Sequence, residues 1–337
     1  MQVREWDPET APACDLDAWR ILINEVFACD LPEEPEWRSD HLRAYLAVNL
    51  PGEHRLMWFA ESGSESGSKV LGSVSILLIG TDTAVLSLFI RPDARRSGVG
   101  RALLAVAARH AYAERRHTLM IEVMVDNAVK FYEAHGFRRT MTEVRHLLNL
   151  ADVDWLRTEQ LAGRLANGYR IEYLPGGPSD QMLEVYARAK QDLRGSGTGQ
   201  DIDQDVVAVE TDRLRASLAT LRGRGLRPHV VVAVHEPTGQ IAGLTEVVVP
   251  THRPERADQY DTLVVPTHRG YGLGLAVKAR LLLALHEAEP QLQDVQTWQS
   301  VEMEQMARVN AVLGFTPDRE WYEYEVEIPD LLTRLGP

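Results

Sequence analysis

The sequence contains few cysteines and few lysines. Only two of its 337 residues are cysteine, Cys14 and Cys29, and their positions fit neither a metal-ligand spacing nor a disulfide framework. We therefore expect both to be buried thiols without a functional role. Lysine makes up only four of the 36 basic residues, a bias that indicates a GC-rich genome and not a mechanism.

Long apolar runs are missing as well. No stretch reaches the length needed to span a bilayer, and Met1 does not open a basic-plus-apolar leader, so we expect a cytoplasmic protein without membrane contact. The net charge of −13 argues against a nucleic-acid-binding surface. It mildly favours a cationic acceptor such as an amine, although acidic residues also simply keep many proteins soluble.

One pattern is present twice. Residues 91–102 and 265–276 each place a proline after an apolar segment, an arginine three residues later, and then Gly-x-Gly before an amphipathic stretch. The glycines allow a tight turn whose N–H groups face one point, and a following helix adds its positive dipole end, which together would bind a diphosphate. Neither copy ends in Gly-Lys-Ser/Thr, which disfavours a triphosphate P-loop, and neither has the three-glycine dinucleotide fingerprint.

These residues carry a resemblance to a known family. Arg95 to Gly100 and Arg269 to Gly274 both match the Arg/Gln-x-x-Gly-x-Gly/Ala pyrophosphate motif of the GCN5-related N-acetyltransferases (GNAT). Downstream, Phe131 to Phe137 is similar to the next helix of that family with its Gly-Phe exit, and Val309 to Phe315 is similar to the same place in the second half. The chain resembles the tandem type that includes mycothiol synthase and acetyltransferases of actinobacterial antibiotic clusters.

The resemblance implies an α/β (α+β) fold with two tandem GNAT domains, each a mixed, mostly antiparallel sheet flanked by helices. We place the N-terminal domain at residues 1–148, a linker at 149–168 and the C-terminal domain at 169–337. The length of 337 residues and the internal repeat support two domains independently of the family. We expect a monomer or a homodimer.

The hydrophobic pattern predicts the main elements. Strands are expected at 56–60, 70–79, 83–90, 118–125, 171–174, 230–234, 241–249, 259–265 and 295–299, and helices at 17–29, 39–50, 99–114, 127–135, 205–222 and from the second Gly-x-Gly to about 287. Gly/Ser-rich connections at 61–69 and 195–199 are expected to be surface loops.

The resemblance also implies acetyl-CoA, or another acyl-CoA, as the cofactor, and no metal. The cofactor-binding residues expected in the first half are Leu88, Phe89, Ile90, Arg95, Arg96, Ser97, Gly98, Val99, Gly100, Arg101, Asn127 and Tyr132. Those expected in the second half are Leu263, Val264, Val265, Arg269, Gly270, Tyr271, Gly272, Leu273 and Gly274.

Two residues of the first half are candidates for catalysis. Tyr132 occupies the place of the family's general acid, which returns a proton to the CoA thiolate, and Glu122 is placed like the general base of some relatives. Alternatively, Tyr132 packs its ring in the core and Glu122 pairs with an arginine. Asn127 departs from the family because Val125 holds the usual place of the asparagine, which puts the pantetheine contact of this helix in doubt.

The second half offers other candidates. Its polar residues near the expected acceptor pocket are Glu246, His252, Gln259, Tyr260, Asp261 and Glu302. Glu246 or Asp261 is expected to take the ammonium proton, directly or through water, and His252 is a third candidate, while each could instead be structural. Asn310 stands at the place of the general-acid tyrosine and Met303 at that of the usual asparagine, so a thiolate here would need another proton donor.

The implied chemistry is direct attack of a neutral small-molecule amine on the acyl-CoA thioester, without a covalent nucleophile. In tandem relatives the second half is usually the catalyst, so we favour it, although the first half has the better catalytic pair. A non-catalytic acyl-CoA-binding or sensing protein and a protein N-acetyltransferase remain alternatives. An amino sugar, an antibiotic precursor and a mycothiol-type amine are all compatible acceptors.

Overall fold

The computed structural model describes residues 1–63, 69–194, 211–300 and 304–336. The chain divides into two compact units, Met1–Glu143 with Arg319–Pro337 and Val144–Asp318. The loop expected at 195–199, the start of the helix expected at 205–222, and Glu302 and Met303 lie outside the described residues. Among the described residues, no helix combines the length and apolar character that crossing a membrane requires.

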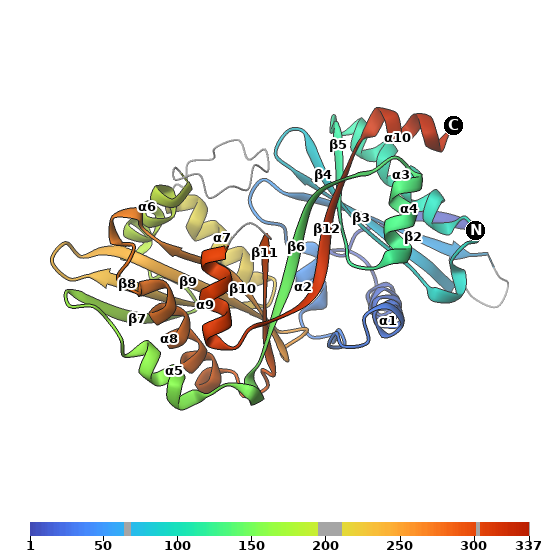
Figure 1. Ribbon diagram of the computed structural model, residues 1–337. Helices are drawn as coiled ribbons and strands as arrows, with labels where there is room; N and C mark the ends of the chain where they lie inside the picture. Colours follow the sequence, from blue (N-terminus) through green and yellow to red (C-terminus); the bar gives the residue numbers. More distant parts are fainter. Residues whose placement is uncertain (64–68, 195–210, 301–303, 337) are drawn as a thin grey trace. The chain divides into compact units, whose positions relative to one another are not determined.

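The first unit is built on a sheet with the strand order β1-β2-β3-β4-β5-β12 (Figure 1). Its strands are β1 (Gln2–Trp6), β2 (His54–Ser62), β3 (Lys69–Ile79), β4 (Thr83–Ile90), β5 (Thr118–Val123) and the later part of β12 (Thr316–Glu327). β4 and β5 run parallel, whereas β1–β2, β2–β3, β3–β4 and β5–β12 are antiparallel. This is the mixed, mostly antiparallel sheet that the family resemblance implied.

Helices cover this sheet. They are α1 (Ala13–Asp30), α2 (Leu42–Ala47), α3 (Val99–Ala113), α4 (Asp126–Ala134) and α10 (Ile328–Leu335), with a 3-10 turn η1 (Pro92–Ala94) between β4 and α3. In α3, Leu103, Leu104, Ala107, Ala108 and Ala111 are fully buried, and their helical spacing produces one apolar face. That face packs on β3 and β4, and α10 packs beside α3.

The second unit repeats the arrangement with the order β11-β10-β9-β8-β7. Its strands are β7 (Tyr169–Pro175), β8 (Leu226–His235), β9 (Gln240–Pro250), β10 (Arg256–Val264) and β11 (Asp294–Ser300), and again one pair, β10–β11, is parallel. Its other elements are η2 (Leu150–Asp152), α5 (Trp155–Ala162), α6 (Leu183–Arg194), α7 (Thr211–Gly223), η3 (Pro266–His268), α8 (Leu273–Ala288) and α9 (Glu304–Leu313). Strand β6 (Arg138–Asn149) contributes residues to both units.

The division differs from the predicted boundaries in two places. The segment 149–168, expected to be a linker, lies inside the second unit, where α5 packs on α8. The last residues of the chain lie in the first unit because Tyr322–Glu327 of β12 pair with Thr118–Val123 of β5. The repeat in the sequence therefore does not coincide with the division of the chain in space.

The prediction that both cysteines are buried is wrong. Cys14 and Cys29 are exposed thiols. They lie near the two ends of α1, whereas the buried residues of this helix are Trp19, Leu22, Ile23 and Val26 in its middle. The apolar stripe that packs against the sheet therefore does not reach either cysteine.

Candidate functional site

Each Gly-x-Gly loop forms an open cradle at the start of a helix. Gly98 is the N-cap residue of α3 with φ 89°, and Gly272 is the N-cap residue of α8 with φ 73°. This left-handed conformation favours glycine, and a Cβ atom added at either position would meet no atom within 4 Å. Neither helix has a side-chain cap, so the first backbone N–H groups of both helices remain available to an anion.

The arginine of the motif fastens the loop to the preceding strand. Arg95 Nε donates a hydrogen bond of 3.2 Å to the carbonyl oxygen of Ile90, and Arg269 Nε donates one of 3.3 Å to that of Val264. The Arg95 guanidinium also makes a bidentate pair with Asp30, at 2.8 and 2.6 Å. We infer that both arginines position the loop, because the Nε of each donates to a backbone carbonyl of the preceding strand.

The two loops share a left-handed position but differ in the residue that occupies it. Gly270 has φ 87°, and the equivalent residue of the first loop, Arg96, has φ 61°. An L-residue other than glycine is strained in this region, so the first loop stores strain that the second does not. In the first loop, Ser97 Oγ donates a hydrogen bond of 2.6 Å to the Ala94 carbonyl, whereas the matching Tyr271 is exposed.

Beside each cradle the two parallel strands separate. The described β4–β5 ladder ends at Leu86–Ile121, four residues before the end of β4, while Leu88 to Ile90 stay paired with β3 on the other side. The β10–β11 ladder ends at Asp258–Gln296, six residues before the end of β10. One backbone edge of each strand end is thus left for a ligand, and the opening begins earlier in the second unit.

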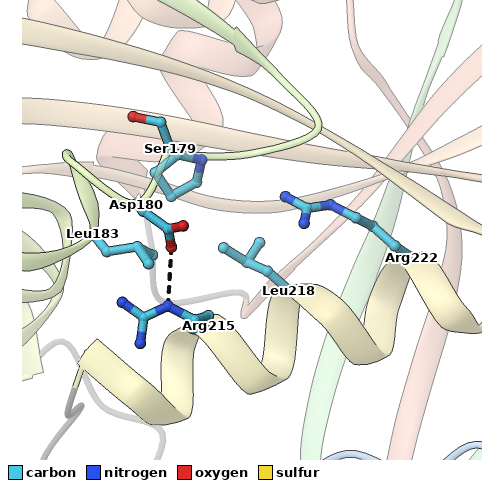
Figure 2. A pocket seen from close by; sticks show the side chains of 7 residues that line it. Ser179, Asp180, Leu183, Arg215, Leu218 and Arg222 are labelled. Atoms are coloured by element: carbon cyan, nitrogen blue, oxygen red, sulfur yellow. Dashed lines mark hydrogen bonds and ion pairs between the residues drawn. The ribbon is translucent and has the colours of Figure 1, made fainter.

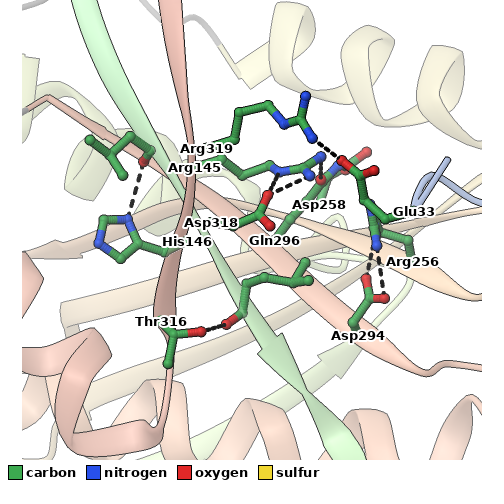
Figure 3. Close-up of polar contacts among 12 residues, drawn as sticks. Glu33, Arg145, His146, Arg256, Asp258, Asp294, Gln296, Thr316, Asp318 and Arg319 are labelled. Carbon is green, nitrogen blue, oxygen red and sulfur yellow. Dashed lines mark hydrogen bonds and ion pairs between the residues drawn. The ribbon is translucent and has the colours of Figure 1, made fainter. Parts of the chain in front are cut away.

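A polar network fixes the place where the second opening begins. Gln296 Nε2 donates a hydrogen bond of 2.6 Å to Asp258 Oδ1, across the last pair of the ladder. Arg145, only 1% exposed, donates to Gln296 Oε1 at 3.3 Å and to Asp318 Oδ2 at 2.6 Å (Figure 3). These interactions hold β10 and β11 together up to this pair and not beyond it.

A bulge in β10 brings three predicted residues together. Two residues of β10, Tyr260 and Asp261, lie opposite the single residue Glu246 of β9. The Lys190 ammonium of α6 donates to Glu246 Oε2 at 2.7 Å and lies 3.3 Å from Asp261 Oδ2. Tyr186 also donates a hydrogen bond to Glu246. Glu246 is therefore held as a counter-ion, whereas 53% of the Asp261 side chain is exposed.

The electrostatics of this group follow from burial and charge. Burial alone would lower the pKa of Lys190, but the Glu246 and Asp261 carboxylates raise it above its ordinary value. Burial and Glu246 raise the pKa of Tyr186 well above that of a free phenol. Lys190 is thus a permanent cation and Tyr186 a permanent hydrogen-bond donor at neutral pH. Of the remaining polar candidates, Gln259 donates to the backbone oxygen of Glu246 at 2.6 Å, and His252 is 1% exposed.

In the first unit, the candidate acid is a core residue. Tyr132 is 4% exposed, and its ring lies 5.2 Å from Phe131 and 5.1 Å from Phe137, centroid to centroid. Burial raises its pKa above that of a free phenol. Glu122 accepts a hydrogen bond of 3.1 Å from Trp321 Nε1 and faces Glu323 across β5 and β12. Burial and Glu323 raise the pKa of Glu122, while Trp321 acts against them.

Other predicted cofactor residues have structural positions. Val99 and Leu273 are buried in the two cores at the first turns of α3 and α8. Arg101 Nη2 donates a hydrogen bond of 2.8 Å to the Leu335 carbonyl, which ties α3 to α10. Asn127 is exposed in the first turn of α4.

Residues beside the second loop were missed by sequence reasoning. Tyr169 of β7 and His268 of η3 share a hydrogen bond of 2.9 Å, and the rings of His235 and Tyr271 lie close to them. Lys278 of α8 was also missed, although it is 2% exposed and donates to Asn310. The sequence did contain a signal for Lys278, because this lysine stands within the otherwise largely apolar segment Leu273–Ala288.

A cavity of about 220 Å³ lies elsewhere in the second unit. It is situated between the start of α6 and α7, where Arg215 donates to Asp180 at 2.9 Å (Figure 2). Leu183 and Leu218 form its apolar part, and the Arg222 guanidinium donates to the Gly176 carbonyl at 2.6 Å. No predicted site residue lines this cavity.

Comparisons with known proteins agree with this geometry. Residues 53–139, which include the first loop, match the family described as acetyltransferase (GNAT) domain. A mycothiol acetyltransferase of Acidothermus cellulolyticus is 30% identical over 158 residues, a match that covers 40% of this chain and 44% of that relative. The match thus spans less than half of the relative's length.

Solved structures extend the likeness to both units. A tandem GNAT protein from the clavulanic acid biosynthesis pathway, without acetyl-CoA, matches with a TM-score of 0.80 and 25% identity over 100% of this chain and 99% of that one. A GCN5-related N-acetyltransferase from Sphaerobacter thermophilus shares the fold with a TM-score of 0.68 and 15% identity over 97% and 95% of the two chains. Residues 53–139 are therefore similar to an acetyltransferase (GNAT) domain, and the chain has the fold of a tandem GNAT protein along its whole length.

Proposed function

We propose that this protein transfers an acetyl or another short acyl group from CoA to the amine of a small molecule, with the second unit as the catalyst. The observation that carries the proposal is the repeated combination of an uncapped helix start, a left-handed glycine and a strand end with one unpaired edge. The cradle suits the diphosphate of CoA, and the strand edge suits the amide groups of its pantetheine arm.

Two features support the second unit as the catalyst. Its strand opening begins earlier, and the β10 bulge places Asp261 at the edge of that opening with half of its side chain in solvent. We assign Asp261 the removal of the ammonium proton of the acceptor, directly or through water. The released lone pair attacks the thioester carbonyl, and the strand backbone N–H groups bind the developing oxyanion.

The acceptor is proposed to be an amine of secondary metabolism. This rests on the likeness to the tandem GNAT protein of the clavulanic acid pathway and to the mycothiol acetyltransferase, both named for small-molecule chemistry. The net charge of −13 suits a cationic acceptor. We propose a protein that resides in the cytoplasm, where acyl-CoA is supplied.

The test compares an acidic with a neutral residue in each loop. Gly272→Asp and Gly272→Asn have nearly the same shape, and both residues tolerate the left-handed conformation, so their difference reports a negative charge placed where the diphosphate binds. We expect Gly272→Asp to weaken acetyl-CoA binding at least about tenfold relative to Gly272→Asn, in isothermal titration calorimetry.

The same pair at Gly98 assigns the catalytic unit. Thiol release with a panel of amines should fall sharply in Gly272→Asp and little in Gly98→Asp. A loss confined to Gly98→Asp would move catalysis to the first unit. Equal acetyl-CoA affinity for the Asp and Asn variants in both loops would refute the cofactor assignment. Binding without thiol release for any amine or peptide would indicate a sensor instead of an enzyme.

A further inference from the structure

The core of the second unit contains a lysine, Lys278, that is almost completely buried. Lys278 is 2% exposed, and its Nζ donates a hydrogen bond of 2.7 Å to Oδ1 of Asn310, which is 0% exposed. Nζ also lies 4.9 Å from the centroid of the Phe315 ring, at cation–π distance. Burying an ammonium group is costly, so this pair calls for an explanation.

The repeat supplies a comparison within the chain. Lys278 lies six residues after Gly272, and the apolar Leu104 lies six residues after Gly98. Asn310 occupies the position of Tyr132, because the following helix exits match: Phe315 N donates to the Asn310 carbonyl at 3.0 Å, and Phe137 N to the Tyr132 carbonyl at 3.1 Å. A Lys–Asn pair in the second unit thus replaces a Leu–Tyr pair in the first.

This pair has unused hydrogen-bonding capacity. Within the described residues, Asn310 Nδ2 has no hydrogen-bond partner, and the bond to Asn310 is the one that the Lys278 ammonium makes. Burying a donor without an acceptor is unfavourable, so an arrangement with several such donors indicates an acceptor that arrives with a ligand. Asn310 stands where the family resemblance places the general-acid tyrosine, so the acceptor expected at this position is the sulfur of the acyl donor.

Resting on the proposed function, we propose that Lys278 is the catalytic acid that protonates the CoA thiolate as it leaves the second unit, and that Asn310 orients it. When the tetrahedral intermediate collapses, the C–S bond breaks and its electron pair goes to sulfur. One ammonium proton of Lys278 passes to that sulfur and yields free CoA. The attacking nitrogen loses its second proton to water, and the neutral amine of Lys278 regains a proton from water after CoA departs.

The electrostatics suit this transfer. Burial lowers the pKa of Lys278 to about 7, and no charged side chain among the described residues adds to this effect. A thiol has a pKa of about 8.5, so a proton moves downhill from such an ammonium to the thiolate. A phenol, with a pKa of about 10, would have to give up its proton uphill.

The experiment first replaces Lys278 alone and then replaces both Lys278 and Asn310 with the residues at the matching positions of the first unit. In Lys278→Met, acetyl-CoA affinity by calorimetry should stay unchanged, while kcat for thiol release falls about 100-fold, a typical loss for a general acid. The double variant Lys278→Leu/Asn310→Tyr should have a kcat at least about tenfold higher than that of Lys278→Met. Leu104→Met, at the matching position of the first unit, is the control and should leave kcat within about twofold.

The pH profile separates an acid from a packing residue. The wild-type kcat should fall as the pH rises above about 7, because Lys278 then loses its proton. In the double variant the same fall should move to higher pH, toward the range of a phenol. Full kcat with an unchanged pH profile in Lys278→Met overturns the inference.

Other outcomes are also decisive. If Lys278→Met unfolds at a lower temperature than the wild type, the double variant carries the test, and a failure to regain kcat in its folded form overturns the inference. If the wild type binds no acetyl-CoA and releases no thiol, the proposed function itself fails, and the assignment of Lys278 fails with it. Binding and turnover in the wild type, with no effect of Lys278, reject the assignment alone.

Discussion

Lys190 Nζ donates a hydrogen bond of 2.7 Å to Glu246 Oε2, with 18% and 15% of the two side chains exposed. Removing one partner of such a pair leaves the other charge buried. We expect Lys190→Met to lower the free energy of unfolding by about 3 kcal/mol, measured by chemical denaturation. Lys190→Met/Glu246→Gln should lose less than the single variant, and the exposed Lys130→Met should change stability by less than about 0.5 kcal/mol. An additive double variant would contradict the pairing.

Within the proposed function, we expect substitution of Asp261 to reduce activity and substitution of Glu246 to reduce mainly stability. Asp261→Asn should reduce kcat about 100-fold near pH 7, because it removes the exposed base at the β10 bulge, and should barely change the melting temperature. Glu246→Gln should act mainly on stability, since this carboxylate is the counter-ion of Lys190. Steady-state kinetics beside thermal unfolding distinguish the two. A large loss of kcat in Glu246→Gln with Asp261→Asn unaffected would reverse the assignment.

We expect the substitution Arg96→Gly to stabilise the protein. The φ of 61° at Arg96 costs an L-residue about 1–2 kcal/mol, and Arg96→Gly removes this cost. Glycine also has a larger conformational entropy in the unfolded chain, which offsets part of the gain. We expect a gain of up to about 1 kcal/mol in the free energy of unfolding. Gly270→Ala, at the matching position of the second loop, should lose about 1 kcal/mol. Equal effects of the two substitutions would show that the two positions are not both left-handed.

His229 predicts a pH dependence of stability. Tyr173 OH lies 2.7 Å from its Nδ1, and Glu289 Oε1 lies 3.0 Å from its Nε2, which suits a neutral imidazole. Burial lowers the pKa of His229 below 6.5, and Glu289 only partly opposes this. The unfolded state therefore binds more protons, so stability is full above pH 6.5 and declines as the pH falls through that value.

Glu289 adds a second decline at lower pH. Its pKa is depressed: burial acts to raise it, but Arg227 and His229 outweigh burial. Its contribution is present above the unfolded pKa of about 4.3 and is lost as the pH falls through the depressed value. Denaturation curves between pH 3 and 8 should show both slopes. His229→Gln should flatten the upper slope and keep the lower one, and an unchanged upper slope would contradict the burial argument.

Local patterns predicted much of the fold. The period of apolar residues located α1, α3 and α8, and the Gly-x-Gly frames located both cradles, because these features depend on residues close together in the sequence. The pairing of β12 with β5 had no such signal, since it joins segments that lie far apart in the sequence, Tyr322–Glu327 and Thr118–Val123. That pairing is the reason why the end of the chain lies in the first unit and not in the predicted C-terminal domain.

For the candidate site as well, the sequence predicted individual residues but not their tertiary partners. The sequence located Glu246 and Asp261 near each other, but it could not show that Lys190, far away in the chain, neutralises Glu246. It identified Asn310 as a departure from the family pattern without indicating that Lys278 fills the vacated space. In both cases a charge meets its partner through tertiary packing, which no local pattern encodes.

The strand segment that pairs with β5 in the first sheet is translated after the whole second unit. Until Tyr322–Glu327 emerge, β5 has an uncovered edge, and until α10 follows, the face of α3 that it covers stays in water. The first unit therefore cannot complete its folding until the whole second unit has been translated. An open strand edge recruits other chains, so crowding during synthesis should harm this protein most in that interval.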